Sequence, residues 1–163
     1  MPKYVLLLII LAVLLAGGLF VRSKWASFTA PVPTPTEAPV VQLPPEKQPK
    51  VALKFTLDGH YVTVNMDNLY AAAVEYNLIY DAKVKNSRLQ TGVNAAAKLD
   101  GQSTYSKEQL LGSESSGKFT YHADIQNAVM ELTLRDSAGR SIFTATYPFT
   151  VSPGKTVELS PSS

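Results

Sequence analysis

Few side chains in this chain have the types and the spacing that catalysis or metal binding requires. Neither histidine, His60 nor His122, belongs to an H-E-x-x-H sequence or to another pattern of metal ligands. A structural or solvated role is therefore our first interpretation for each histidine, ahead of metal binding and base catalysis. The chain has no cysteine. Disulfides, thiolate zinc ligands, thiol nucleophiles and a lipid-modified cysteine are thereby excluded.

Two further segments carry polar groups that we tested against known chemistry. Residues 112–117 are rich in serine, but no serine there has the glycine spacing of a nucleophile elbow, so we expect a flexible loop. Asn65, Asp67 and Asn68 could offer oxygens to calcium at a sheet edge, yet they lack the regular spacing and distal Glu of an EF-hand loop. We therefore predict no enzyme activity, no metal and no cofactor.

The tyrosines are the more informative side chains. A single core does not need all of Tyr61, Tyr70, Tyr105 and Tyr121, and tyrosines near loops often contact protein or carbohydrate. The alternative is that they are ordinary residues at the edge of the core. We expect a binding surface around the serine-rich loop, with the loop at residues 136–140 as a second place to look. The predicted binding residues are Glu114, Ser115, Ser116, Tyr121 and His122.

Charge is distributed unevenly along the chain and argues against nucleic-acid binding. The formal net charge is +2, with five Lys and Arg against two Asp and Glu in residues 1–50 and nine against ten in residues 51–152. A nucleic-acid-binding surface needs clustered cations to replace the counterions of phosphates. The folded part of the chain has no such cluster, so we do not expect a nucleic-acid partner.

We expect an N-terminal apolar segment to hold the domain at a membrane. Residues 4–21 carry no charge and, as a helix, would span roughly 27 Å at about 1.5 Å per residue, close to the thickness of the hydrocarbon core. Lys3 precedes the segment, and Arg22, Lys24 and Trp25 follow it; the Trp suits the membrane interface. We predict an uncleaved, single-pass anchor over residues 1–25.

A cleaved signal peptide is the alternative to this anchor. Residues 16–18 (Ala-Gly-Gly) resemble a cleavage site, but the apolar run continues for three residues beyond them. The short N-terminal flank and the long polar remainder favour an inside N-terminus, with the rest of the chain exported to the periplasm or the cell exterior.

A proline-rich linker, residues 26–50, follows the anchor. Residues 31–49 contain seven prolines, which favours polyproline II or disorder. We interpret the segment as a spacer that projects a domain away from the bilayer. The alternative is a docking motif for a domain that reads proline-rich peptides.

From residue 51 to 155 the sequence indicates a β-sandwich, with a short tail over residues 156–163. Apolar and polar residues alternate in several short runs, for example in residues 72–81 and 128–135, and turn signals separate them. Asp58-Gly59 predicts a two-residue type I′ hairpin turn. We predict an all-β domain of seven or eight strands, forming a two-sheet sandwich of the immunoglobulin or fibronectin type III kind, with a small barrel as the alternative.

Two segments of this domain resemble a known group of proteins. Residues 110–122 (LLGSESSGKFTYH) and 75–81 (EYNLIYD) are similar to uncharacterised, membrane-anchored immunoglobulin-like sandwich proteins of candidate-phylum bacteria. The resemblance implies an exported, anchored sandwich and no activity. A cysteine pair often brackets the Ser-Ser-Gly turn in that group, whereas Glu114 and Phe119 stand here, so the implied disulfide is missing. Residues 68–70 and 80–81 also resemble cohesin modules over a shorter stretch.

These observations together predict a membrane-anchored, extracytoplasmic module without catalytic activity. We expect it to act in protein interaction, adhesion or as an accessory subunit, with the membrane contacted through residues 4–21 and an unknown protein as partner. The alternative is a carbohydrate-binding domain at the cell surface, which uses exposed tyrosines as platforms for sugar rings.

Overall fold

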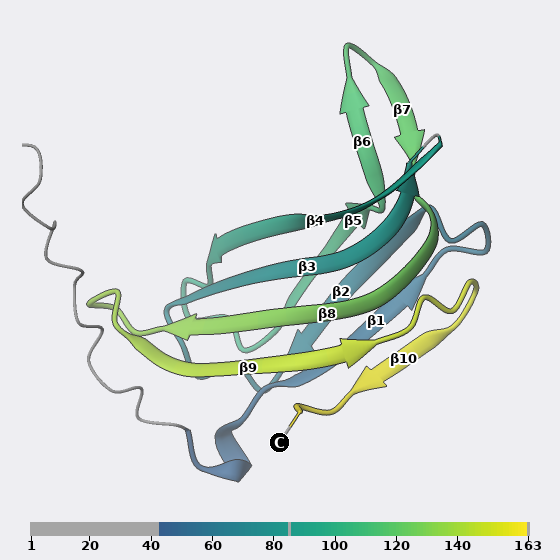
Figure 1. Cartoon of the computed structure of the whole chain (residues 1–163). Helices are drawn as coiled ribbons and strands as arrows, with labels where there is room; N and C mark the ends of the chain where they lie inside the picture. Colours follow the sequence, from purple (N-terminus) through teal and green to yellow (C-terminus); the bar gives the residue numbers. More distant parts are fainter. Residues whose placement is uncertain (1–42, 85, 163) are drawn as a thin grey trace, which may run out of the picture. The chain divides into compact units, whose positions relative to one another are not determined.

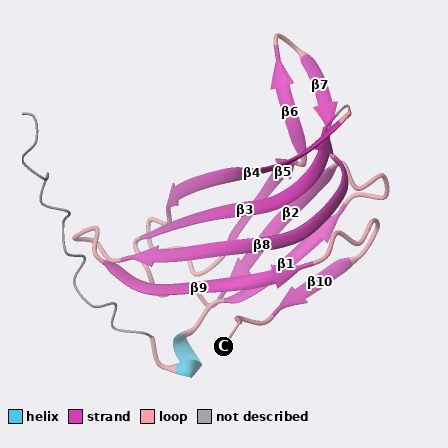
Figure 2. Cartoon of the chain, viewed as in Figure 1, coloured by secondary structure: helices cyan, strands magenta, loops and turns pink. Residues whose placement is uncertain are grey.

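The structure is a computed structural model that describes residues 43–84 and 86–162. The described part of the chain is all-β apart from one 3-10 turn, η1 (Pro45–Lys47), as the fold prediction required (Figure 2). The predicted anchor and most of the predicted linker lie outside the described residues. No helix in the described part is long and apolar enough to cross a bilayer. The strands are β1 (Lys50–Phe55), β2 (Tyr61–Asp67), β3 (Ala73–Val84), β4 (Ser87–Lys98), β5 (Tyr105–Leu110), β6 (Gly112–Ser115), β7 (Lys118–Tyr121), β8 (Ala123–Arg135), β9 (Ser141–Phe149) and β10 (Thr156–Leu159).

These strands form two main sheets and a separate hairpin (Figure 1). One four-stranded sheet has the order β10-β1-β2-β5, and the other has the order β4-β3-β8-β9. All pairings between strands are antiparallel. The hairpin of β6 and β7, which we call the arm, projects from the connection between β5 and β8.

The alternating patterns formed strands because every second side chain reaches one common core. The predicted inward rows of β2, β3 and β8 are all buried, and in β9 only Ala145 is partly buried. Tyr76, Tyr80 and Tyr147 are among the largest fully buried side chains, which explains how a domain without a tryptophan fills its centre. Burying one large apolar side chain contributes roughly 1.5–3 kcal/mol.

Several boundaries differ from the prediction. The described residues contain ten strands where seven or eight were expected, and β4 begins five residues before the predicted Gly92. The connection between β1 and β2 spans residues 56–60 and is not a two-residue type I′ turn. Gly59 has φ +70°, but Asp58 is not left-handed. The Asp58 carboxylate instead accepts hydrogen bonds from the Thr56 hydroxyl at 2.6 Å and the His60 N–H at 3.0 Å, which favours a wider turn.

The prediction of a flexible loop at residues 112–117 was wrong. Residues 112–115 pair with residues 118–121, and Ser116 and Gly117 form the turn between them. Both turn residues are left-handed, with φ 51° and 73°, as a two-residue type I′ turn requires. A serine-rich composition therefore concealed a regular hairpin.

The sandwich has two distinct ends. Lys50 pairs with Asp67 at the end where the described chain begins, which we call the proximal end. The strands β1, β3 and β5 run from there to the opposite, distal end, where the arm and the loop at residues 56–60 lie (Figure 1).

The last part of the predicted linker is packed on the proximal end. Leu43 packs against the core, and Pro49 is buried. Asn68, which has φ 61°, donates from Nδ2 to the carbonyl oxygens of Glu46 at 3.0 Å and Gln48 at 2.9 Å. The folded unit therefore includes residues 43–50 as well as the predicted sandwich.

Candidate functional site

Four aromatic rings gather where the arm joins the sandwich. The ring of His60 stacks on that of Tyr121, with centroids 3.7 Å apart and planes 5° from parallel. Tyr61 meets the edge of Tyr121 at 6.3 Å, and Phe119 lies parallel to Tyr121 at 6.4 Å. We call His60, Tyr61, Phe119 and Tyr121 the aromatic cluster. It joins the β1–β2 connection to the arm, two segments far apart in the sequence.

Backbone contacts at the root of the arm hold this cluster in place. Leu111 is fully buried, its N–H donates to the carbonyl oxygen of His60 at 2.8 Å, and its own carbonyl accepts from His122 N–H at 2.9 Å. Gly112 follows directly, and a Cβ at that position would lie 2.5 Å from the carbonyl oxygen of Thr120. The strands β6 and β7 can therefore approach each other this closely only because residue 112 is glycine.

The loop that carries His60 is itself fixed. The Thr56 hydroxyl and the His60 N–H donate to Asp58 and hold the pKa of that carboxyl below its usual value. The His60 Nδ1 lies 3.2 Å from Asp58 Oδ2. These contacts orient the imidazole, so that its face meets the face of Tyr121.

The outer part of the cluster faces solvent. Phe119 is 49% exposed and Tyr121 is 40% exposed, whereas Tyr76, Tyr80 and Tyr147 in the core are buried; outside the arm, Tyr70 is also exposed. Leu57, in the same loop as His60, is 91% exposed. A two-stranded hairpin has no second sheet to cover an apolar face. The distal end therefore presents apolar surface that the fold itself does not use, and such surface often marks an interaction site.

The structure places the predicted binding residues in different surroundings. Glu114, Ser115 and Ser116 are exposed on the arm, and Tyr121 belongs to the aromatic cluster. His122 points inward, with its Nδ1 3.1 Å from the Tyr80 hydroxyl. Burial lowers the pKa of His122 and raises that of Tyr80 to about 12, so this pair is held neutral at neutral pH.

The second predicted loop, residues 136–140, does not join this site. It connects β8 to β9 at the proximal end, away from the arm. Asp136 accepts from the backbone N–H groups of Ala138 and Arg140 and from the Arg140 guanidinium at 2.8 Å, which lowers the pKa of Asp136. Its polar groups are thus used to shape the loop.

Sequence reasoning missed two features of this site. His60 was assigned a structural role by default, and Phe119 entered only through a resemblance. The alternation of Phe119 and Tyr121 was the available signal, because residues two apart share one face of a strand. Their contact with His60 could not be predicted, since it depends on how two distant connections meet.

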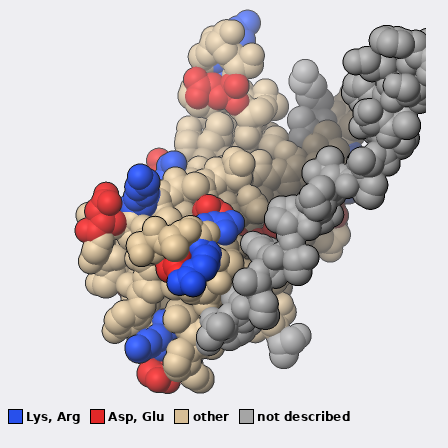
Figure 3. Space-filling view, turned by 90° about the vertical axis from the view of Figure 1, so that its left-hand side faces the viewer, with Lys and Arg blue, Asp and Glu red and all other residues tan. Residues whose placement is uncertain are grey.

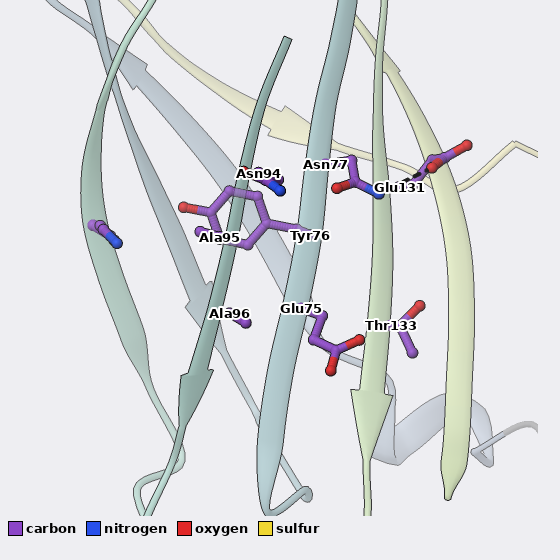
Figure 4. Close-up of a pocket in the computed structure, with 9 residues that line it drawn as sticks. Glu75, Tyr76, Asn77, Asn94, Ala95, Ala96, Glu131 and Thr133 are labelled. Atoms are coloured by element: carbon purple, nitrogen blue, oxygen red, sulfur yellow. Dashed lines mark hydrogen bonds between the residues drawn. The ribbon is translucent and has the colours of Figure 1, made fainter. Parts of the chain in front are cut away.

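A polar hollow of about 530 Å³ is lined by residues of β3, β4 and β8 together with Lys107 of β5 (Figure 4). Asn94, Asn77 and Glu131 form one row across β4, β3 and β8, and the Asn77 amide donates to Glu131 Oε2 at 3.3 Å. Glu75 lies in the next row and pairs with Arg135 at 2.9 Å. The hollow offers hydrogen-bonding groups and no aromatic platform, apart from the buried Tyr76 beneath it.

The remaining candidates carry other contacts. Asn65 Oδ1 accepts from the Ser106 hydroxyl at 2.8 Å, and Asn68 holds the proximal segment, so these two amides of the considered calcium site serve the fold. Within residues 43–84 and 86–162, no group of three or more His, Cys, Asp or Glu could hold a metal ion. On the face shown in Figure 3, cationic and anionic side chains are interspersed.

Comparisons with protein-family models, with curated proteins and with solved structures found no match to this chain. The resemblance to anchored sandwich proteins of candidate-phylum bacteria therefore stays a prediction, and the site must be interpreted from its own geometry.

Proposed function

We propose that this chain is a membrane-anchored, extracytoplasmic module without catalytic activity, and that it binds a protein partner through its distal end. The observation that carries the proposal is the exposed pair Phe119 and Tyr121, which is supported from beneath by His60. Aromatic side chains that are fixed before binding lose little conformational entropy on association, and they are common anchors of protein interfaces.

The direction of the chain supports this assignment. The described chain begins at the proximal end, and the aromatic cluster lies at the other end of the strands. Because the predicted anchor and linker precede Leu43, the arm lies at the end of the domain that is farther from the predicted anchor. A partner outside the membrane can reach the arm there.

We further assign the sandwich to the immunoglobulin and fibronectin type III class. The order β4-β3-β8-β9 corresponds to the C′-C-F-G sheet of that class, and β1-β2-β5 corresponds to A-B-E. The arm is then an insertion between strands E and F, and β10 is an addition beside strand A. Insertion of a hairpin into a connection is how such folds gain binding surface without altering their core.

The anchor and the orientation are tested by protease treatment of intact cells that express the full chain. We expect cleavage within residues 26–42 and a resistant fragment that begins near Leu43, because Asn68 and the core hold the chain from there on. A periplasmic domain would be cut only after the outer envelope is permeabilised. Protection under both conditions would contradict an exported domain.

The binding surface is tested with a photo-crosslinking amino acid at position 119. We expect a covalent adduct of defined mass on intact cells, and none from the matched control at Thr144, an exposed position of β9. The adduct should disappear when Tyr121→Ser is added. Equal crosslinking from both positions, or none from position 119, would contradict binding through the arm.

The parallel rings of Phe119 and Tyr121 also favour a second candidate, a glycan that stacks on them. A glycan array distinguishes the two. Binding of the purified chain that is lost in both Phe119→Ala and Tyr121→Ala, without any protein adduct on cells, would favour the carbohydrate and replace the protein partner.

A further inference from the structure

The outer edge of β4 has no strand beside it among the described residues. Leu99 N–H donates to the Ala72 carbonyl oxygen at 2.8 Å, at the end of the β3–β4 ladder. Because hydrogen-bonded pairs alternate in an antiparallel ladder, this bond fixes which residues of β4 face β3. The odd-numbered residues direct their N–H and C=O groups at β3. The groups that point outward belong to Arg88, Gln90, Gly92, Asn94, Ala96 and Lys98.

The other sheet edges carry features that discourage a further strand. On β5, Lys107 lies opposite the buried Val64, on the core-facing side of the strand. β9 contains Pro148, and its Thr146 carbonyl accepts from Ser162 N–H at 2.8 Å. β10 is only four residues long. Inward charges, prolines and short strands are the usual protections of sheet edges.

β4 itself has none of these protections. Between its residues 89 and 97 it contains no charge and no proline, and it extends over 12 residues, while Lys107 of β5 lines the same hollow as Asn94 and Ala96. The outward groups of β4 form a long row of donors and acceptors that suits another extended strand.

We propose that β4 pairs antiparallel with β4 of a second copy of this chain, about a two-fold axis at Asn94. Asn94 then meets its own counterpart, Gly92 meets Ala96, and Gln90 meets Lys98. Each of these pairs exchanges two backbone hydrogen bonds, about ten in all. The β4-β3-β8-β9 sheets of the two copies become one continuous sheet of eight strands. The interface is self-complementary, as a two-fold dimer requires.

Charge disfavours one neighbouring register, the one with its axis at Val93. With the axis at Asn94, the Lys98 ammonium lies opposite the uncharged Gln90, and the Arg88 guanidinium keeps its ion pair with Asp124 of the same chain. With the axis at Val93, Arg88 would lie opposite Lys98, and like charges directly opposite each other are unfavourable. Two asparagine amides at the axis can donate to and accept from each other.

This interface is independent of the arm and goes beyond the proposed function. β4 runs from the distal to the proximal end, so antiparallel pairing places the two arms at opposite ends of the dimer, and likewise the two proximal ends that lead to the predicted linkers. Two copies anchored in one membrane pair in this way only if the predicted linker of one copy runs back along the domain to the bilayer. Neither aromatic cluster is covered by the pairing. If the arm binds no partner, dimerisation through β4 is unaffected. If β4 does not dimerise, binding through the arm is unaffected.

The absence of cysteine makes a disulfide test direct. In the full chain, purified in mild detergent, Asn94→Cys should form a covalent dimer on mild oxidation. The two Cα atoms of such a pair lie about 5.5 Å apart, within the range that a disulfide bridges. The matched control is Asn77→Cys, exposed on the same face one strand further in, where the corresponding distance is about 14 Å, or three strand spacings.

Sedimentation of the chain over a range of concentrations gives the second readout. We expect a reversible dimer that Asn94→Lys dissociates, since two ammonium groups would meet at the axis, whereas Asn77→Lys leaves it intact. A monomer at every concentration would overturn the proposal. So would a dimer that Asn94→Lys does not weaken, or equal crosslinking by Asn94→Cys and Asn77→Cys.

Discussion

The sandwich and the arm are both antiparallel β-structure with alternating side chains, but they use this alternation differently. In the sandwich, the inward side chains of two sheets share one core, in which Leu78 and Tyr76 are buried. In the arm, two strands of four residues stand without a sheet opposite them. Phe119 therefore stays about half exposed, although its position in the pattern matches that of a core residue.

The two regions therefore have different roles: the inward residues of the sandwich stabilise the fold, and the aromatic residues of the arm are available for binding. The inward residues of the sandwich are explained by the free energy of unfolding that they contribute, and no binding role is needed for them. The aromatic residues of the arm contribute little to a common core, so their presence is better explained by an external contact. Substitutions in the core should therefore change stability, whereas substitutions in the arm should change binding.

Leu78→Ala should lower the free energy of unfolding by about 2–5 kcal/mol, because it leaves a cavity in a fully buried row. Urea denaturation followed by circular dichroism measures this. The control is Leu57→Ala, which removes the same atoms from a side chain that is 91% exposed and should change stability by less than about 0.5 kcal/mol. Equal effects would show that the loop at residues 56–60 is as tightly packed as the core.

Asn68→Ala should cost about 2 kcal/mol, because it removes two hydrogen bonds to the proximal segment and places a Cβ at positive φ. The control Asn68→Gly loses the same bonds but tolerates this backbone conformation, and should cost less. Protease digestion provides a second measurement, with cleavage expected to move into residues 43–49 in both variants. Unchanged cleavage would contradict the role of Asn68 in holding this segment.

Acidification should destabilise the domain through His122. Burial lowers the pKa of His122 in the folded state below its ordinary value of 6.5, so the unfolded chain binds the proton more readily. About one pH unit above 6.5 and higher, His122 is neutral in both states and there is no cost. As the pH falls below 6.5, the free energy of unfolding falls.

The variant His122→Gln isolates this contribution. The melting temperature of the wild type should decrease from pH 7.5 to 5.5 by more than that of the variant. Asp58 and Asp136 do not interfere, because their lowered pKa values keep both carboxylates charged in this range. An identical pH dependence in the two proteins would show that His122 is not desolvated in the folded state.

Phe119→Ser should have the smallest effect on stability, within about 0.5 kcal/mol, because half of the ring is exposed. Tyr121→Ser should cost slightly more, since a stacked aromatic pair contributes about 0.5–1.5 kcal/mol and this change removes the contact with His60. Denaturation of both variants measures these values. A cost for Phe119→Ser similar to that of Leu78→Ala would place the arm within the structural core and remove the argument for a binding role.

The parts of the fold that could be predicted are those in which local pattern and tertiary position agree. Val74, Tyr76, Leu78 and Tyr80 alternate with polar residues, and each faces the core, because β3 lies in the middle of its sheet. The first five residues of β4, 87–91, are exposed or only partly buried at a sheet edge. Their polar and mixed sequence gave no alternation to detect before Gly92.

The turn and the site depended on contacts that the sequence does not display. Asp58-Gly59 has the composition of a two-residue turn, yet the Thr56 hydroxyl and the His60 N–H both bind Asp58 and widen the connection. In the arm, the serine- and glycine-rich composition suggested a loop, although residues 112–115 pair with residues 118–121. The stack of His60 on Tyr121 arises only when Leu111 joins both segments at the distal end.

The most direct test of the account is cysteine labelling of the arm on intact cells. Lys118→Cys places the only thiol of the chain on the arm, next to Phe119, and Thr144→Cys places it on the exposed face of β9. A membrane-impermeant maleimide should modify both variants at similar rates in the purified chain. On cells whose outer envelope has been permeabilised, we predict that the variant at position 144 reacts as before, while the variant at position 118 is protected by the bound partner. Equal reactivity of both positions would contradict a binding role for the arm, and protection of both would contradict an exported domain.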